Sequence, residues 1–334
     1  MKRAHSAVIA ILGDGGWGTA LALHLSHRGH QVRWWGPFPA YLAQMARTRT
    51  NPKYLPGIRI PRAIRIVPNL AEAIGPAQTV VVVIPSQYLR SIVTKLAPLP
   101  LTGKSVLNAG KGLELSTLAR QSQVIQDELG RVPLAVLSGP NIAGEIAQGQ
   151  PASAVIASRS PRLASSLQRL FNDERLRIYT SSDVIGVELG GALKNSIAIA
   201  AGVADGLGFG ANAKSALLSR GIVEMARLGV AMGAKRDTFW GLSGLGDLIT
   251  TCLGGRNRWL GEQLGKGRSL AQIQAATPSV IEGVNTAKAA GVLSRQHHVE
   301  LPIIEQVHAV LSNRTTPRAA LHALMTRTPK TELR

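Results

Sequence analysis

The chain is poor in several residue types, and each shortage excludes a class of protein. One cysteine, Cys252, among 334 residues excludes a disulfide framework and is typical of a reducing compartment. Aromatic residues make up only 4% of the chain, and no basic cluster is interleaved with them as in many nucleic-acid-binding surfaces. We therefore expect a cytoplasmic globular protein that does not bind nucleic acid.

Long uninterrupted apolar runs are also missing. No apolar stretch is free of polar residues over the roughly 20 residues that a membrane span requires, so we expect no span. The apolar residues up to Leu12 resemble a signal start only superficially, because they are few and run directly into glycines without a cleavage pattern. They predict a strand instead.

Acidic residues are scarce: 19 Asp and Glu stand against 38 Lys and Arg, which gives a formal net charge of +19. The basic residues are scattered along the whole chain. An anionic small-molecule ligand or a solvated basic surface therefore explains the charge about as well as a nucleic acid does. The length and the 45% hydrophobic content suffice for two domains with a large core.

The two halves of the chain have different patterns. Short β-branched runs alternate with helical stretches in the first half, which predicts an α/β fold with a parallel sheet. Those runs are 8–12, 31–35, 79–84, 105–109, 134–138, 152–157 and 176–179. Beyond Asp183 the pattern predicts only helices, at 187–204, 213–232, 258–264, 284–296, 303–311 and 317–325. We predict a Rossmann-type domain over 1–182 and an all-α domain over 183–334.

A glycine-rich loop follows the first predicted strand. Gly13, Gly15 and Gly18 have the G-x-G-x-x-G spacing, and the chain passes directly from them into a helical segment. Such glycines permit a tight turn, close approach of the backbone to a pyrophosphate, and helix packing on the sheet, while the helix N-terminus favours the phosphates. This context predicts a dinucleotide site. Asp14 is awkward beside a pyrophosphate, and we expect its carboxylate to face away.

The acid that usually ends the second strand and binds the adenosine ribose of NAD is absent. No Asp or Glu occurs from Gly15 through Ala71, whereas Arg33 lies on the strand and Pro37 follows it. The residues lean slightly toward NADP or dual use and leave the choice open.

Lys194 is a charged residue inside the apolar run 187–204, where charge is costly. Its side chain would lean over Gly190 and Gly191, so we expect open space there for a substrate oxygen. A side chain at either glycine should then block the substrate and leave the fold nearly intact. Glu188 is six residues away and points elsewhere, so the partner of Lys194 has to come from another segment or from a ligand.

Two further segments carry polar residues suited to a site. Lys111 follows a predicted strand and is flanked by glycines, although a solvated loop lysine would have the same pattern. Asp247 could be the missing counter-ion of Lys194, or a helix N-cap. Arg256, with N–H groups near Gly254 and Gly255, suits a phosphate, or is a surface charge. The eight histidines do not combine with acids or Cys252 at metal-ligand spacing, so we expect no metal.

These segments, taken in order along nearly the whole chain, resemble the NAD(P)-dependent glycerol-3-phosphate dehydrogenase family. The most specific blocks are Glu188-Leu-Gly-Gly-Ala-Leu-Lys-Asn195 and Asp205-Gly-Leu-Gly-Phe-Gly-Ala-Asn212. The resemblance implies a fold like that of 6-phosphogluconate dehydrogenase, a homodimer, and NAD or NADP as cofactor. It further implies interconversion of sn-glycerol 3-phosphate and dihydroxyacetone phosphate, which supplies glycerol 3-phosphate for phospholipid synthesis.

The resemblance also assigns roles to residues. It places the general acid/base on Lys194, held by Asp247 beside Asn195, and it places Lys111 between cofactor and substrate. The candidate catalytic residues are Lys194, Asn195, Asp247 and Lys111. The candidate substrate-binding residues are Lys111, Gly139, Asn141, Lys194, Asp247, Thr251, Gly255, Arg256 and Asn257. The candidate cofactor-binding residues are Gly13, Gly15, Gly16, Trp17, Gly18, Arg33, Pro37, Lys111, Ala143, Arg256, Val280 and Glu282.

Some positions depart from the bacterial pattern of that family. Asn141 stands where Ser or Thr is common, and the short loop Gly254-Gly-Arg-Asn257 resembles that of eukaryotic members, which favours substrate contacts through backbone N–H groups. Pro37 replaces a common basic residue and weakens the case for NADP. Two alternatives stay open: a relative of 6-phosphogluconate dehydrogenase, whose Lys-x-x-His-Asn spacing this chain lacks, and a non-enzymatic cofactor-sensing or nucleic-acid-binding protein.

Overall fold

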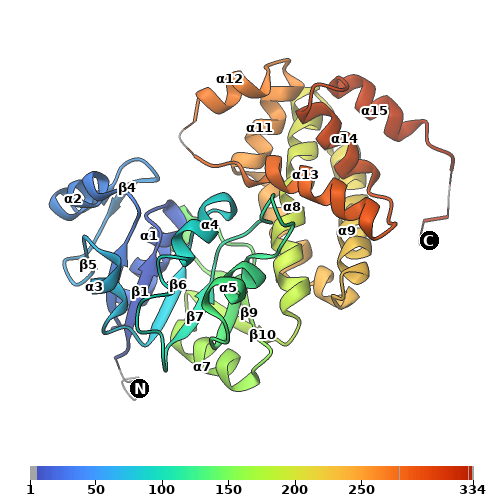
Figure 1. The fold of residues 1–334 in the computed structure, drawn as a ribbon. Helices are drawn as coiled ribbons and strands as arrows, with labels where there is room; N and C mark the ends of the chain where they lie inside the picture. Colours follow the sequence, from blue (N-terminus) through green and yellow to red (C-terminus); the bar gives the residue numbers. More distant parts are fainter. Residues whose placement is uncertain (1–5, 278, 330, 333–334) are drawn as a thin grey trace.

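The computed structural model describes residues 6–277, 279–329 and 331–332. An eight-stranded sheet forms the centre of the first half, in the order β10-β9-β8-β7-β6-β1-β2-β5 (Figure 1). Its strands are β1 (Val8–Leu12), β2 (Gln31–Trp35), β5 (Arg65–Ile66), β6 (Thr79–Val82), β7 (Ser105–Asn108), β8 (Leu134–Ser138), β9 (Ala152–Ala157) and β10 (Leu176–Ser181). A separate antiparallel pair joins β3 (Thr50–Asn51) and β4 (Leu55–Arg59).

The described sheet is parallel, as predicted, except for one antiparallel pairing that the sequence did not predict. β9 pairs antiparallel with β8, with Val136 opposite Ala157, and β10 runs parallel to β9. The connection from β8 to β9 holds only the five-residue helix α6 (Ala143–Ala147). A parallel return usually needs a longer crossover over the face of the sheet, whereas this short connection turns the chain back.

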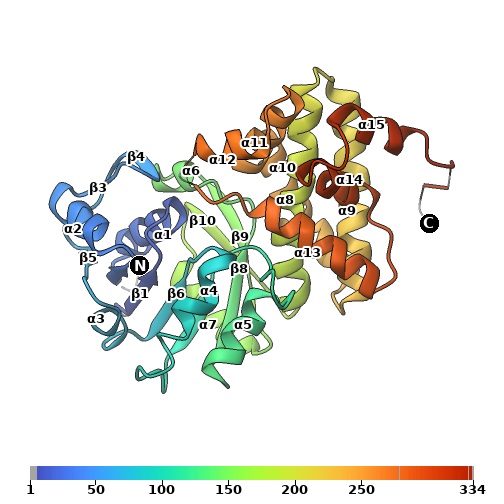
Figure 2. The same cartoon turned by 45° about the horizontal axis from the view of Figure 1, so that its top comes forward.

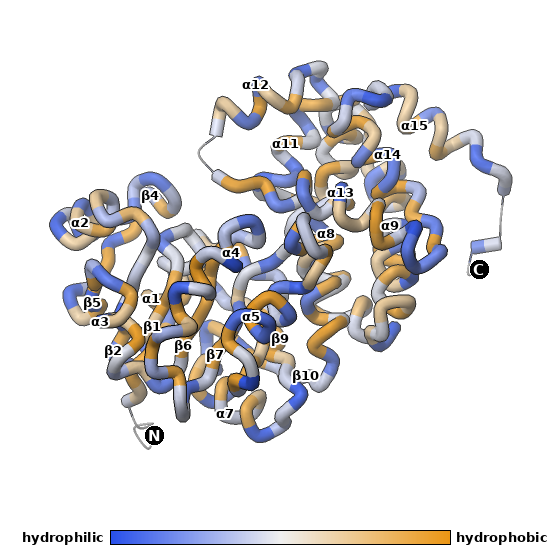
Figure 3. The backbone as a smooth tube through the Cα atoms, viewed as in Figure 1, coloured by the Kyte–Doolittle hydropathy of each residue, from blue (hydrophilic) through white to orange (hydrophobic). Residues whose placement is uncertain are grey.

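Helices cover the sheet, and apolar strands lie between them. Besides α6 they are α1 (Gly16–His27), α2 (Pro39–Thr48), α3 (Leu70–Ile74), α4 (Ser86–Val93), α5 (Gln121–Leu129) and α7 (Pro161–Phe171). All four residues of β6 are buried, as expected for a central strand with both faces covered. The hydrophobic colour along the strands in Figure 3 marks this core. Strands β3, β4 and β5 are short and were not predicted.

The second half is helical where the structure describes it. Its elements are α8 (Val184–Gly206), α9 (Ala211–Ala231), the 3-10 turn η1 (Arg236–Trp240), the π-helical turn η2 (Leu242–Gly246), α10 (Asp247–Leu253), α11 (Arg256–Gly265), α12 (Leu270–Ala275), α13 (Glu282–Gln296), α14 (Pro302–Leu311) and α15 (Pro317–Met325). The sequence did not predict η1, η2, α10 or α12. The last strand ends at Ser181 and α8 begins at Val184, close to the predicted domain boundary.

Helix α8 is the axis of this half, and α9, α10, α11 and α13 pack around it (Figure 2). It is long and apolar enough to cross a membrane by length and composition, yet 78% of its apolar window is buried inside the structure. That degree of burial is typical of the core helix of a globular protein. Helix α8 also contacts β8, so some of its side chains lie next to the sheet.

Candidate active site

The glycine loop lies at the carboxyl end of β1, where the strand order of the sheet reverses between β1 and β6. This switch point is where open α/β sheets bind ligands. Gly13 has φ +130°, and a Cβ there would overlap the main-chain oxygen of Val83. Trp34 donates its Nε1–H to the oxygen of Gly13 at 2.8 Å and fixes the turn. Only glycine fits this position.

The rest of the loop forms a cradle that suits a dinucleotide. Helix α1 begins at Gly16, so its free N–H groups face the loop. Trp17 donates to the oxygen of Ala109 at 3.1 Å and ties α1 to the end of β7. A Cβ at Gly16 would lie 3.8 Å from that of Ala143, which places Ala143 beside the loop. These neighbours pack closely around the loop, and no side chain caps the N-terminus of α1.

The sequence raised expectations for three residues near this loop. Asp14 turns its side chain toward Gly36, just after β2, and is buried there. Arg33 pairs with Ala10 in mid-strand and donates to the oxygen of Glu72 at 3.1 Å, so the structure does not bring it to the loop. Pro37 lies two residues after the end of β2.

The chemical centre of the site is a carboxylate between two lysines. Asp247 accepts from Lys194 Nζ at 2.7 Å on one oxygen and from Lys111 Nζ at 2.5 Å on the other. Lys111 also donates to the oxygen of Gly139 at 3.0 Å, and Lys194 to the hydroxyl of Thr251. Lys194 and Asp247 are buried, while Lys111 is partly exposed. Two cations facing one carboxylate leave an excess positive charge, which favours an anionic ligand.

The pKa of Lys194 is lowered to about 8. Burial is the largest cause, since the ammonium loses its hydration, and the positive charge of Lys111 adds to it. Asp247 opposes both effects because it stabilises the charged form. An amine with such a pKa can hold or release a proton near neutral pH, as a general acid or base must.

The space beside Gly190 and Gly191 is filled, which corrects the expectation of open ground. A Cβ on Gly190 would lie 2.7 Å from the main-chain oxygen of Ser243 in η2, and one on Gly191 would lie 2.5 Å from Ser138 Oγ. The two glycines therefore allow η2 and β8 to approach α8 closely. They do not leave room for a substrate oxygen.

Helices α8, α11 and α13 meet at two asparagines. Asn257 Nδ2 donates to Asn195 Oδ1 at 2.8 Å, and Gly283 N donates to Asn257 Oδ1 at 3.0 Å. Both side chains are buried, and each satisfies part of the other's hydrogen-bonding capacity. They therefore orient the helix that carries Lys194. Arg256, the first residue of α11, donates to the oxygen of Val280 at 2.9 Å.

Two further residues predicted for the substrate side, Gly255 and Asn141, lie in loops. Gly255 has φ +103° and immediately precedes α11, so its N–H belongs to a free helix N-terminus. Asn141 donates to the oxygen of Ser153 at 3.3 Å, and its own Oδ1 is buried without a donor. Thus the predicted residues on the substrate side come from the segments after β7 and β8, from α8 and α10, and from the start of α11.

The sequence did not predict two sets of hydrogen bonds that join the two halves of the chain. Glu282 accepts from Ser86 N at 3.0 Å and from Ser86 Oγ at 2.6 Å, so it bridges α13 to the start of α4. Glu188 accepts from Arg120 and from Ser122 N, at 2.5 Å and 2.7 Å, and joins α8 to the start of α5. The only available signal was that Glu188 is the single acid in the apolar run before Lys194.

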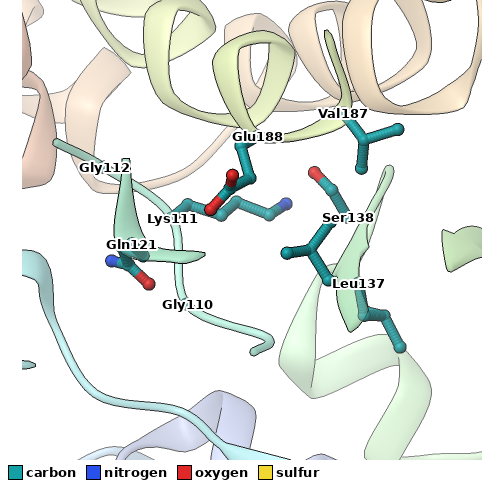
Figure 4. Close-up of a pocket in the computed structure, with 9 residues that line it drawn as sticks. Gly110, Lys111, Gly112, Gln121, Leu137, Ser138, Val187 and Glu188 are labelled. Carbon is teal, nitrogen blue, oxygen red and sulfur yellow. The ribbon is translucent and has the colours of Figure 1, made fainter. Parts of the chain in front are cut away.

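These anchors flank a small cavity beside Lys111. Figure 4 shows Glu188 and Val187 from α8 above it, and Lys111, Gln121 and Ser138 around it. The amide of Gln121 and the hydroxyl of Ser138 are buried without partners among the described protein atoms. Such a polar cavity suits an ordered water that would satisfy them.

Comparison with known proteins places the chain among nicotinamide-dependent dehydrogenases. Residues 8–164 match the family described as NAD-dependent glycerol-3-phosphate dehydrogenase N-terminus, and residues 183–322 match the corresponding C-terminus. A glycerol-3-phosphate dehydrogenase [NAD(P)+] of Salinibacter ruber is 45% identical, over 98% of this chain and 96% of that protein. One from Geobacter metallireducens is 46% identical over 97% and 98%.

Solved structures agree with the sequence relatives. The crystal structure of glycerol-3-phosphate dehydrogenase from Coxiella burnetii superimposes with a TM-score of 0.93 at 36% sequence identity. The match covers 96% of this chain and 99% of that one. The two halves of the chain therefore follow one known architecture from end to end.

Proposed function

The chain belongs to the NAD-dependent glycerol-3-phosphate dehydrogenase family, and we propose that Lys194, Asp247 and Lys111 carry the chemistry of its reaction. The enzyme interconverts sn-glycerol 3-phosphate and dihydroxyacetone phosphate with NAD(H) or NADP(H). When bound, the nicotinamide gives hydride to, or takes it from, the central carbon of the substrate. The residues of this chain have to move the hydroxyl proton, hold the phosphate and exclude water.

Lys194 is the general acid and base in this proposal. In the oxidative direction its neutral amine accepts the hydroxyl proton as hydride leaves the carbon. In the reductive direction its ammonium returns that proton to the carbonyl oxygen. The single observation that carries this assignment is the buried contact of 2.7 Å between Lys194 Nζ and Asp247 Oδ1, in an environment that lowers the pKa of Lys194 to about 8.

Lys111 polarises the same oxygen from the Rossmann side. Asp247 holds it at 2.5 Å, so the side chain is placed before substrate arrives and loses little entropy on binding. Because Lys111 and Lys194 share one carboxylate, their separation is set by the two oxygens of Asp247. This arrangement directs two donors toward one developing oxyanion.

The phosphate is held at the start of α11 in this proposal. Arg256 provides a planar fork, and the N–H groups at Gly255 and at the beginning of the helix point toward the same anion. Asn257 orients this helix through Asn195, and Thr251 links Lys194 to α10. Gly139 and Asn141 border the substrate from the end of β8.

The cofactor lies along the glycine loop in this proposal. Gly13, Gly15, Gly16 and Gly18 line the pyrophosphate, which the N-terminus of α1 favours. Trp17, Ala143, Val280 and Glu282 border the nicotinamide half. The hydrogen bond from Ser86 to Glu282 supports this placement, because it joins the two halves of the chain, and the one from Arg256 to Val280 holds these two residues together within the helical half.

We further propose a homodimer in the cytoplasm that supplies glycerol 3-phosphate for phospholipid synthesis. An apolar groove between α8, α9, α14 and α15 supports the dimer, since it would bury side chains such as Leu207 and Leu324. The single cysteine supports the compartment. Sedimentation of the purified protein measures the number of subunits.

The central assignment is tested by replacing Lys194. Lys194→Met should lower kcat for reduction of dihydroxyacetone phosphate by about a thousandfold or more, because Lys111 only polarises the oxygen and Lys194 is the group that gives it a proton. The oxidation of NADH and of NADPH is followed at 340 nm, and cofactor affinity should stay within about twofold. Lys266→Met is the matched control: this lysine is exposed, paired only with Glu262, and should leave kcat unchanged. Substantial residual turnover in Lys194→Met would reject the assignment.

A further inference from the structure

The end of β2 has no side chain where a nicotinamide cofactor usually meets an acid. Strand β2 ends at Trp35, and the next residue is Gly36, about 20 residues after the glycine loop. In dinucleotide-binding folds an Asp or Glu at this place accepts the hydroxyls of the adenosine ribose. Gly36 cannot do so.

The carboxylate of Asp14 occupies the space that this missing side chain would take. A Cβ built on Gly36 would lie 2.7 Å from Asp14 Cγ and 2.8 Å from Asp14 Oδ2. Asp14 stands between the first two glycines of the loop, so the acid comes from the end of β1 and not from the end of β2. The chain thus places a carboxylate between the loop that binds pyrophosphate and the strand end that binds ribose.

This carboxylate is buried but not satisfied. Asp14 is only 6% exposed, and its Oδ2 is buried with no hydrogen-bond donor among the residues that the structure describes. Burial accordingly raises the pKa of Asp14 above its ordinary value. A buried acceptor without a donor is costly, and the hydroxyls of a ribose are donors that would satisfy it.

The position of Asp14 is held by its main chain. Asn51, which is fully buried, donates its Nδ2 to the oxygen of Asp14 at 2.8 Å and to Thr19 Oγ1 at 2.7 Å. Tyr41 donates in turn to Asn51 Oδ1 at 2.5 Å. The carboxylate is therefore fixed by its neighbours without any of them using its oxygens.

Lys53 is the charged group that opposes Asp14. Its Nζ lies 5.0 Å from the ring centre of Tyr54 and 5.9 Å from that of Phe38, and its positive charge acts on Asp14. Lys53 is exposed, so water and salt screen it, whereas the Asp14 carboxylate is buried. The buried carboxylate is thus less screened by water and salt than the cation that faces it.

We propose that Asp14 replaces the missing acid of β2, accepts the adenosine ribose hydroxyls of NAD(H), and disfavours the 2′-phosphate of NADP(H). The inference rests on the proposed cofactor site at the glycine loop and deepens it to a preference for NAD(H). A phosphate at the 2′ position would approach a buried carboxylate, and the repulsion between them is weakly screened.

Binding of the reduced cofactors to the full-length protein tests this without turnover. Titration of NADH and NADPH, followed by their fluorescence, should give a Kd for NADPH about tenfold or more above that for NADH. In Asp14→Asn the ratio should fall to about threefold or less, mainly because NADPH binds more tightly. Lys53→Met is the control and should widen the ratio.

Two outcomes would overturn the proposal: NADPH bound by the wild type as tightly as NADH, or the same ratio in Asp14→Asn as in the wild type. Thermal unfolding checks that the variant folds, and Asp14→Ser repeats the test if it does not. If the enzyme reduced dihydroxyacetone phosphate with NADPH but not with NADH, the role of Asp14 would be refuted and the proposed function would stand.

Discussion

At the scale of single residues, Lys194 is the group whose environment determines its use. Its charge is buried next to an apolar helix core, and Asp247 is the main group that offsets the loss of hydration. Neither the free energy of burial nor the ion pair alone would suit catalysis: burial by itself would keep the amine neutral, and a close pair by itself would keep it charged. Their balance leaves the pKa at about 8.

This balance predicts opposite pH dependences for the two directions. Reduction needs the ammonium, so its kcat should fall as pH rises through about 8, whereas oxidation needs the neutral amine, so its kcat should rise over the same interval. Initial rates at saturating substrates from roughly pH 6 to 10 measure both profiles. In Asp247→Asn the reductive limb should move to lower pH, because Asp247 favours the charged form. If kcat for reduction and kcat for oxidation changed in the same direction with pH, the role assigned to Lys194 would be contradicted.

Cys252 shows the opposite effect of burial on a titratable group. It lies on α10 and is fully buried, and desolvation raises the pKa of its thiol to about 12. The thiol is therefore neutral at physiological pH and behaves as a small apolar side chain.

At the scale of elements, α8 packs closely against its neighbours where it carries glycines in place of larger residues. Gly190 and Gly191 remove side chains from the face that meets η2 and β8, so the lysine one turn later reaches Asp247 at the junction of both. Turn η2 is π-helical and ends at Gly246, immediately before Asp247, so it sets the position of that carboxylate. Irregular helical turns of this kind are frequent at functional sites.

The two glycines should respond differently to alanine. Gly190→Ala places a methyl group 2.7 Å from a main-chain oxygen that cannot rotate away, so it should destabilise the protein by about 1–3 kcal/mol. Gly191→Ala meets the hydroxyl of Ser138, which can rotate, and should cost less. Denaturant unfolding compares both variants with the wild type. Equal stability of Gly190→Ala and wild type, with activity lost, would restore the idea of open space for substrate.

At the scale of the whole molecule, the site exists only because two halves of the chain are held together. Lys111 comes from the sheet and Lys194 from the helices, and Asp247 lies between them. Glu188 and Glu282 fasten the halves on either side of this cluster through Arg120 and Ser86. Charge is also a property at this scale, since a net +19 attracts anionic substrate and cofactor.

Breaking one of these anchors should affect stability and substrate affinity together. Glu188→Gln leaves Arg120 buried with a neutral partner and should cost about 3 kcal/mol, seen as a lower thermal midpoint. The Michaelis constant for dihydroxyacetone phosphate should rise, because Lys111 shares the cavity beside Glu188. Glu262→Gln, which loses partly exposed ion pairs with Lys266 and Arg258, is the control and should change both quantities little. An unchanged Michaelis constant in Glu188→Gln would separate the anchor from the site.

Much of the architecture could be predicted from local pattern. The β-branched runs and the helical periodicity located seven strands and six helices because burial imposes those periods on the sequence. Short elements such as β5 and α12 escaped, since two to six residues carry too little periodicity to be recognised. The antiparallel turn from β8 to β9 escaped as well, because strand direction depends on the path of the connection.

The sequence by itself determined the family, the order of the elements and the residue types available for chemistry, because these depend on local spacing and on motifs of neighbouring residues. Only the tertiary structure decided which residues meet. It paired Asp247 with Lys111 as well as Lys194, filled the space over Gly190, withdrew Arg33 from the glycine loop and turned Asp14 against Gly36. Each of these facts depends on atoms from distant segments, whose distances are set by packing and by hydrogen bonds across the fold and are not encoded in any local pattern.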